Sequence, residues 1–211
     1  KDSSGRALYA SWPYDTGVAE PGWRVWKMGN SPTGSPNGIN QTMGMDAFAR
    51  YFSVPAQTNF DYERFNFDLA SDLVSDTGRI NDPVSTDLSA WDARGGKLIV
   101  YQGVSDPVFS ADDIAAWYEA VASTDAGANS TRLFMAPGMT HCGGGRATDQ
   151  FDAFAALRNW VENDIEPARI VAQGSSLPGV TRPLCPFPAY AHYTGGDVAS
   201  ATNFECRAPG Q

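Results

Sequence analysis

The sequence predicts an α/β fold in which two parallel strands are connected through a helix. A short apolar run at 98–101 after a glycine turn predicts a buried strand, and a second apolar run at 133–136 predicts a strand over 131–136. A helical pattern follows each run, from 110 and from about 148 to 163. Strand, loop and helix in this repeated order are typical of a parallel sheet with helical crossovers. Two strands are too few for a doubly wound core, so we expect most of the sheet to come from elsewhere.

The first part of the chain has weaker patterns. Residues 1–40 are rich in Gly, Pro, Ser and Trp with many turn signals, which predicts irregular and partly buried structure. Residues 42–53 predict a helix that ends before Pro55, and 65–76 predict a second short helix.

The helices around the strands have recognisable ends. We expect a helix over 85–93, with Ser85 as its N-cap. Ser110 is placed to cap the helix that follows, whose first turn carries two acidic residues at the positive end of the helix dipole. The last predicted helix ends near residues 165–167.

Composition excludes some classes of partner. The 211 residues carry a net charge of −9, which disfavours nucleic acid and anionic membranes as partners. No stretch approaches the roughly 20 apolar residues that span a bilayer. The first residues lack the apolar segment of a signal peptide, so either a signal was removed or the chain begins inside a longer precursor. With two histidines and no CxxC, we expect no metal site in this sequence.

The three cysteines divide into a pair and a single residue. Cys185 and Cys206 lie in a tail rich in Pro, Gly and aromatic residues, where a disulfide would close a loop of roughly 20 residues and stabilise the fold by about 3 kcal/mol. Cys142 is left over. It is either a free buried thiol or one half of a disulfide to a segment outside the chain, in an oxidising compartment.

Two residues at strand ends carry the chemistry. Asp106 follows the first predicted strand and His141 the second, and functional groups of α/β sheets lie at the carboxyl ends of strands. Acid before base matches the chain order Ser, Asp, His of one class of hydrolases. The histidine would move the proton of a serine hydroxyl while the aspartate fixes the imidazole tautomer. Each residue alone also has a purely structural interpretation. Asp106 could be an ordinary turn residue, and His141 could be an ordinary loop histidine. His192 is interpreted as structural.

A nucleophile is missing from the sequence. A serine nucleophile needs small neighbours for its sharp turn, and G-x-S-x-G does not occur. Ser105 lacks the second glycine and would place serine and aspartate side by side on one loop.

The chain resembles the tannase/feruloyl esterase family of α/β hydrolases, and within it the MHETase-like bacterial branch. The matching stretches run in family order along nearly the whole chain, and the His-Cys and Arg-Pro-Leu-Cys-Pro motifs are specific. The stretches are Ser11–Gly17, Gly22–Trp26, Gly95–Ile99, Gly103–Pro107, Pro137–Gly145 and Arg182–Pro186.

The resemblance implies a Ser-His-Asp triad in which Asp106 is the acid and His141 the base. The family's serine lies upstream in a Cys-Ser-x-Gly-Gly motif, and the cysteine of that motif is bonded to the position of Cys142. Cys185 and Cys206 match a second, C-terminal disulfide. The upstream half of the enzyme, with the serine and most of the sheet, lies outside this chain.

The resemblance also implies a division of the chain. Residues 1–60 match the end of a lid domain and 61–211 the C-terminal part of the hydrolase domain. Trp12, Arg24 and Phe109 are expected to contact substrate, with Arg24 able to pair with a carboxylate and Phe109 with an aromatic acyl group. Arg24 could equally be a surface arginine beside two tryptophans. Catalysis requires no cofactor, and a structural calcium ion is expected in the upstream lid portion.

These expectations describe part of a secreted or periplasmic serine esterase. Its substrates would be aromatic acid esters of the feruloyl, galloyl or terephthalate monoester type, and its partner the N-terminal portion that carries the serine. Neither nucleic acid nor membrane is an expected partner. The alternative is a degenerate esterase or a non-catalytic module that binds aromatic or carbohydrate ligands through Trp12, Trp23 and Trp26.

Overall fold

The computed structural model describes residues 1–210, with the backbone alone at residue 62. The chain forms two compact units. Unit 1 comprises Lys1–Ser11 and Pro21–Val84, and unit 2 comprises Trp12–Glu20 together with the chain from Ser85 on. Within the described residues, no helix is both long enough and apolar enough to cross a membrane.

Unit 1 is built from short helices. The predicted helix over 42–53 is present as a nearly continuous run of helical turns, and the helix predicted at 65–76 extends further, to Asn81, where Asn66 caps its start by accepting from the backbone of Asp68 and Leu69. The prediction of irregular structure over 1–40 was partly wrong, because a seven-residue helix lies within it. The elements are α1 (Pro21–Lys27), α2 (Ile39–Thr42), α3 (Gly44–Ala47), the π-helix η2 (Phe48–Phe52), η3 (Tyr62–Arg64) and α4 (Phe67–Asn81).

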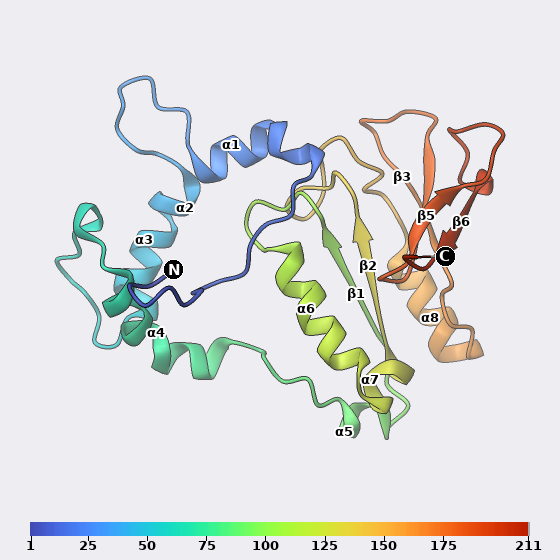
Figure 1. Cartoon of the computed structure of the whole chain (residues 1–211), viewed down its shortest axis with the longest axis horizontal. Coiled ribbons are helices and arrows are strands. Elements are labelled where there is room, and N and C mark those ends of the chain that lie inside the picture. The colour runs from blue at the N-terminus through green and yellow to red at the C-terminus, as the bar shows by residue number, and fades with distance from the viewer. Residues whose placement is uncertain (211) are drawn as a thin grey trace. The chain divides into compact units, whose positions relative to one another are not determined.

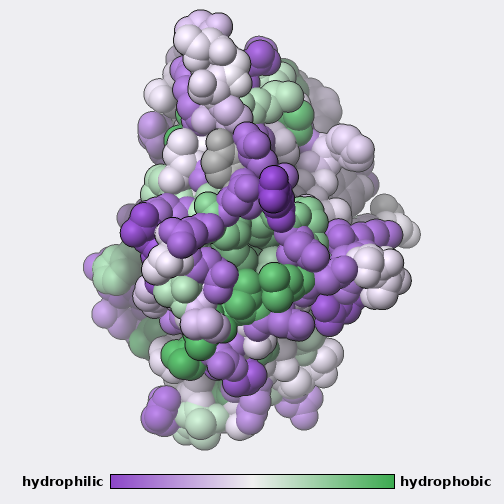
Figure 2. Space-filling view, turned by 90° about the vertical axis from the view of Figure 1, so that its left-hand side faces the viewer, coloured by the Kyte–Doolittle hydropathy of each residue, from purple (hydrophilic) through white to green (hydrophobic). Residues whose placement is uncertain are grey.

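Aromatic rings form the core of unit 1. The ring centroid of Phe48 lies 5.1 Å from that of Phe60 and 5.3 Å from that of Phe65. Other large apolar side chains stay exposed, among them Ile80 at 83% and Val84 at 77%. On the face shown in Figure 2, hydrophobic residues gather around a hollow with hydrophilic residues about it. Exposed apolar surface of this kind marks a surface suited to contact with another segment or a ligand.

Unit 2 contains the predicted parallel pair. Strand β1 (Leu98–Gly103) pairs with β2 (Thr131–Ala136) in parallel, with Leu98 opposite Thr131 and Gly103 opposite Ala136. Between them the chain passes through α6 (Ala111–Ala122) and the short α7 (Asp125–Ser130). The crossover is the connection that parallel strands require, and Figure 1 shows α6 beside the two strands.

Capping residues explain where the helices of unit 2 begin. Ser110 caps α6 as predicted, accepting from the backbone of Asp112 and Asp113. The helix α8 (Ala153–Asn163) begins later than predicted, because Asp152 caps it and Gln150 is already tied to Gln173 in a β-bridge. The helix predicted over 85–93 is reduced to α5 (Ser89–Asp92), and Ser85 does not cap it. The 3-10 helix η1 (Thr16–Ala19) also belongs to this unit.

The main core lies on one face of the parallel pair. Neighbouring residues of a strand point to opposite faces, so Phe134 and Ala136 share a face with Ile99. On that face Phe134 and Ala136 are fully buried and pack with residues of the C-terminal strands. Phe151 and Ala153 are partly buried and pack against this cluster. The opposite face meets α6, where Tyr118 and Val121 are buried. Both faces of β2 are therefore largely covered, whereas β1 is only partly buried and its Tyr101 is exposed.

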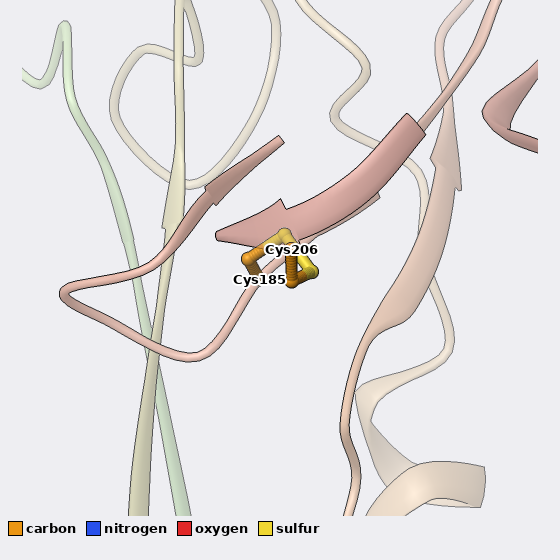
Figure 3. Close-up of a disulfide and its surroundings, with 2 residues drawn as sticks. All are labelled: Cys185 and Cys206. Atoms are coloured by element: carbon orange, nitrogen blue, oxygen red, sulfur yellow. A yellow bond between two sulfur atoms is a disulfide. The ribbon is translucent and has the colours of Figure 1, made fainter. Parts of the chain in front are cut away.

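The tail folds into two antiparallel ladders. Strand β3 (Ile170–Gln173) pairs with β4 (Thr181–Leu184), and β5 (Tyr190–Tyr193) pairs with β6 (Phe204–Arg207), which follows η4 (Ala201–Asn203). Cys185 and Cys206 form a disulfide with their Cα atoms 5.5 Å apart (Figure 3). This bond connects the end of β4 to β6 and confirms the expected pairing in the tail.

Candidate active site

Asp106 lies in the loop that leaves β1. The loop is attached to the end of β2, because Val104 donates from its backbone to the carbonyl of Ala136 and Ser105 donates to that of Met139. Asp106 itself is 4% exposed. A buried carboxylate needs several hydrogen-bond donors to offset the loss of water, and the loop supplies them.

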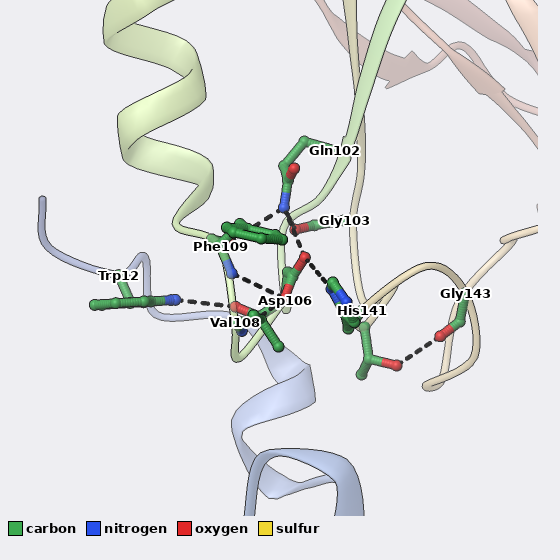
Figure 4. Close-up of polar contacts among 9 residues, drawn as sticks. Trp12, Gln102, Gly103, Asp106, Val108, Phe109, His141 and Gly143 are labelled. Carbon is green, nitrogen blue, oxygen red and sulfur yellow. Dashed lines mark hydrogen bonds and ion pairs between the residues drawn. The ribbon is translucent and has the colours of Figure 1, made fainter. Parts of the chain in front are cut away.

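Four donors surround the Asp106 carboxylate. Oδ1 accepts from the backbone of Val108 at 2.7 Å and of Phe109 at 3.2 Å. Oδ2 accepts from Gln102 Nε2 at 3.1 Å and contacts His141 Nδ1 at 3.1 Å (Figure 4). A carboxylate only accepts hydrogen bonds, so Nδ1 of neutral His141 carries the ring proton and Nε2 is the acceptor nitrogen. Asp106 and His141 thus form an oriented acid–base pair.

Hydrogen bonds within its own loop hold His141 in place. Thr140 Oγ1 donates to the carbonyl of Gly143 at 2.7 Å, and the backbone of Gly144 donates to Asp149 Oδ2 at 2.7 Å. The loop begins at Gly138, whose φ of +75° would strain any other residue, and a Cβ there would lie 2.4 Å from a backbone oxygen. The His141 side chain remains 30% exposed, which leaves the imidazole accessible to a reacting group.

Two further side chains hold the acid loop. Gln102 Nε2 also donates to the carbonyls of Gly103 and Phe109, at 3.3 and 3.2 Å, so one amide joins the strand end to the loop. Trp12 Nε1 donates to the Asp106 carbonyl at 3.0 Å. From the sequence, Trp12 is expected to contact substrate, whereas Gln102 is not among the residues expected to be functional. The one signal for Gln102 was a polar residue in an otherwise apolar strand.

The other expected substrate contacts lie in different units. Phe109 is 61% exposed, and its ring centroid lies 5.5 Å from that of His141. Arg24 lies on α1 in unit 1, where its side chain is exposed. The structure therefore brings Trp12, Phe109, Asp106 and His141 together within unit 2, while Arg24 belongs to the other unit.

Ser105 is not placed as a nucleophile. It is 2% exposed, and its hydroxyl donates to Asp15 Oδ2 at 2.5 Å while it accepts from the backbone of Gly17 at 2.9 Å. This hydroxyl is therefore buried and already engaged in two hydrogen bonds. The burial of Ser105 agrees with the sequence argument against a nucleophile beside Asp106.

Cys142 lies on the surface and directly follows His141. It is a free, exposed cysteine with a φ of +60°, a backbone conformation that is uncommon for residues other than glycine and typical of constrained functional loops. In the described structure the thiol is exposed rather than buried. A cavity of about 340 Å³ lies beside Cys142. It is lined by Tyr101, Met139, Cys142, Asp149, Phe151, Asp152, Ala153 and Phe154.

No ligand set for a metal ion occurs among residues 1–210, since no three of their His, Cys, Asp and Glu side chains come together in a suitable group. The calcium ion implied by the family would need ligands from the upstream portion. The calcium ion remains a prediction for that portion.

An aspartate and a histidine that contact each other after successive parallel strands match the chain order of acid and base in α/β hydrolases. A protein-family model described as "Tannase and feruloyl esterase" matches residues 1–207. The chain belongs to this family.

Relatives and solved structures agree with this assignment. The chain is 36% identical to mono(2-hydroxyethyl) terephthalate hydrolase of Piscinibacter sakaiensis, over 99% of the chain and 39% of that protein. It is 32% identical to a probable feruloyl esterase of Arthroderma benhamiae, over 70% of the chain and 30% of that protein. Feruloyl esterase B from Aspergillus oryzae superposes with a TM-score of 0.70 at 20% identity, over 98% of the chain and 43% of that structure. The chain thus spans about two fifths of these relatives or less.

Proposed function

We propose that the chain is the C-terminal portion of a serine carboxylic-ester hydrolase that acts on aromatic acid esters. It supplies the acid and the base of a Ser-His-Asp triad, and the serine lies outside the chain. The observation that carries the proposal is the 3.1 Å contact between Asp106 Oδ2 and His141 Nδ1 at the ends of two parallel strands. This geometry is what an imidazole needs to act as an oriented general base.

The roles of the two residues follow from their hydrogen bonds. His141 Nε2 takes the proton of the attacking serine hydroxyl and then protonates the leaving alcohol. Asp106 keeps the Nδ1 proton in place and stabilises the imidazolium that forms. Because three other donors already hold its carboxylate, Asp106 can do this without reorientation, which favours catalysis by a preorganised site.

The unpaired edge of β1 supports an upstream portion. Among the described residues β1 forms a ladder with β2 alone, and Tyr101 in this strand is 51% exposed. An uncovered strand edge invites pairing, and parallel strands normally lie inside larger sheets. We expect an upstream strand of the same protein to pair with β1 and to bring the serine to the carboxyl ends of the strands.

Cys142 is the proposed attachment point for that portion. The thiol is exposed beside the base and borders a partly apolar cavity, so a second segment can reach it and cover the cavity. A disulfide from the cysteine beside the serine to Cys142 would hold nucleophile and base at a fixed separation. Intact mass under non-reducing and reducing conditions tests this bond. Loss of an attached segment on reduction supports it, and a wild-type protein that keeps a free Cys142 thiol contradicts it.

The aromatic substrate class rests on Phe109, Arg24 and the relatives. Phe109 presents an exposed ring beside His141, where it can pack on an aromatic acyl group. Arg24 would pair with a substrate carboxylate if the substrate is a terephthalate monoester, which is the substrate class in the name of the relative from P. sakaiensis. Feruloyl and galloyl esters are the other candidates. We further propose that residues 1–60 are the end of a lid domain, with 61–211 in the hydrolase domain.

The location proposed for the enzyme is outside the cytoplasm, secreted or periplasmic. The Cys185–Cys206 disulfide supports this, because such bonds persist in oxidising compartments. We propose that neither nucleic acid nor membrane is a partner, since the chain carries a net charge of −9.

Activity measurements test the function directly. The chain joined to its upstream portion should hydrolyse p-nitrophenyl and feruloyl esters, and His141→Ala should abolish the activity. His192→Ala is the matched control, because His192 is the second histidine and lies in β5, away from the acid–base pair. The 211 residues alone should be inactive. If the isolated chain hydrolyses esters and this activity depends on His141, the nucleophile lies within the chain and the proposal is wrong on this point.

The alternative of a non-catalytic binding module has less support. In such a module His141 would lack an oriented acid and Cys142 would be buried, whereas the imidazole contacts Asp106 and the thiol is exposed. Trp12, one of the tryptophans that would bind ligand, uses its indole N–H on the acid loop. An inactive joined protein that still binds ferulate would favour the module or a degenerate esterase.

A further inference from the structure

Asp15 connects the two loops that carry the acid and the base. A single oxygen of its carboxylate, Oδ2, accepts from Ser105 Oγ at 2.5 Å and from the backbone of Gly138 at 2.7 Å. Ser105 directly precedes Asp106, and Gly138 lies three residues before His141. Asp15 is separated from Ser105 by 90 residues and from Gly138 by 123 residues. A distant segment thus reaches both loops at once.

The segment around Asp15 is fitted closely to the acid loop. The backbone of Gly17 donates to Ser105 Oγ at 2.9 Å. A Cβ at Gly17 would lie 2.0 Å from the Ser105 Cβ, so only glycine permits this approach. Trp12 adds a third attachment through the Asp106 carbonyl. Segment 12–17 therefore contacts the acid loop at both the residue before the acid and the acid itself.

We propose that Asp15 is a positioning residue for the acid–base pair, an inference that rests on the proposed function of Asp106 and His141. The two loops are otherwise joined near the pair by backbone hydrogen bonds to Ala136 and Met139 and by the Asp106–His141 contact. Asp15 adds a charged acceptor that fixes Ser105 and Gly138 relative to each other. Hydrogen bonds to a carboxylate are stronger than those to a neutral acceptor, so the separation of the loops is set before substrate binds.

This role predicts a graded response to substitution. Asp15→Ala removes the acceptor for both donors. Asp15→Asn keeps a neutral amide oxygen that can accept, so its effect should be smaller. Ser105→Ala removes one of these two donors, so that Asp15 Oδ2 keeps the hydrogen bond from the Gly138 backbone but loses the one from Ser105. Asp164→Asn is the control for loss of charge, because Asp164 is exposed in a left-handed conformation that asparagine tolerates.

Ring nitrogen NMR of the 211-residue chain reads the position of His141 without any need for activity. The chain has two histidines, so His192 serves as the internal reference in the same spectrum. In wild type we expect the tautomer with the proton on Nδ1. Asp15→Ala should lower the population of this tautomer at His141 and leave the spectrum of His192 unchanged. In Asp15→Asn the population at His141 should lie between those of Asp15→Ala and wild type. Folded Asp15→Ala with a wild-type His141 spectrum would overturn the proposal.

Kinetics of the chain joined to its upstream portion provide the second readout. A misplacement near 1 Å costs up to about 100-fold in rate, so kcat of Asp15→Ala should fall by roughly 10- to 100-fold while KM changes little. If Asp15→Ala does not fold, Ser105→Ala decides, with the same shift expected at His141 and its absence overturning the proposal. A wild-type protein without esterase activity would contradict the proposed function, and the NMR result would still decide the role of Asp15.

Discussion

Gln102 Nε2 and His141 Nδ1 both lie 3.1 Å from the same oxygen of Asp106, Oδ2. The strand residue and the proposed general base thus share one acceptor. Gln102 is 9% exposed and its amide also reaches two backbone carbonyls. From its position in β1, Gln102 therefore helps to fix the direction in which the carboxylate faces His141.

Replacing Gln102 should reduce turnover more than binding. In Gln102→Leu the Asp106 carboxylate loses one donor, and the carbonyls of Gly103 and Phe109 lose theirs. We expect a loss of about 1–3 kcal/mol in the free energy of unfolding, from buried acceptors left unsatisfied. In the joined protein kcat should fall while KM stays near wild type, as measured by steady-state kinetics and a urea titration. Equal kcat in the variant would show that the other three donors suffice.

Asp106→Asn should leave the fold intact and remove most of the activity. The amide can present an N–H to Nδ1, which then accepts and moves the ring proton to Nε2, the wrong nitrogen for a general base. In a serine protease the same change costs about 10,000-fold in kcat, and we expect a loss of this order in the joined protein. Unchanged melting temperature in the variant separates this effect from misfolding. Activity within tenfold of wild type would contradict the assignment of the acid.

Strand patterns and strand-end residues could be predicted from the sequence because they follow from local periodicity. Leu98–Gly103 and Thr131–Ala136 each contain a short apolar run, and the proximity of the residues that follow them needs only the topology of a parallel crossover. Helix ends were less predictable. Ser85 has the chemistry of an N-cap, yet α5 begins at Ser89, because capping depends on backbone geometry as well as on residue type.

The supporting residues could not be found in the same way. Asp15 meets Ser105 and Gly138 across separations of 90 and 123 residues, and no local pattern encodes such a contact. Gln102 lies in a strand whose apolar character hides it. The domain boundary at residue 60 stays a prediction, as do the roles in substrate binding.

Trp12→Phe should weaken the acid loop without removing the aromatic ring. The variant loses the N–H that reaches the Asp106 carbonyl, which should lower the free energy of unfolding by about 1 kcal/mol. If Trp12 only supports the loop, kcat should fall equally for a feruloyl ester and for p-nitrophenyl acetate. A KM that rises for feruloyl esters alone would instead show that the indole contacts the aromatic acyl group. Thermal unfolding and kinetics on both esters distinguish the two results.

The N-terminal turn of unit 1 should tolerate acid. A hydrogen bond from the Ser4 side chain, aided by Arg6, lowers the pKa of Asp2 from 3.8 to about 2. A lowered pKa in the folded state stabilises the fold above pH 3.8, and this contribution disappears as the pH falls toward 2. Ser4→Ala should move the pKa of Asp2 back toward 3.8 in a carboxyl NMR titration. The same pKa in both proteins would exclude Ser4 as the main cause.

Arg24 offers a test of the substrate class, because a guanidinium recognises a carboxylate that only some aromatic esters carry. In the joined protein, Arg24→Gln should raise KM for a terephthalate monoester by roughly 10- to 100-fold, the loss of a charge-assisted hydrogen bond, and leave KM for a methyl ferulate unchanged. Arg24→Lys should recover only part of the affinity, since an ammonium cannot form the bidentate pair. Arg50→Gln is the matched control, because Arg50 is an exposed arginine of the same unit that is paired with Asp46. Equal changes in KM for both esters would mean that Arg24 does not bind the substrate carboxylate. Feruloyl and galloyl esters would then be the better candidates for the substrate.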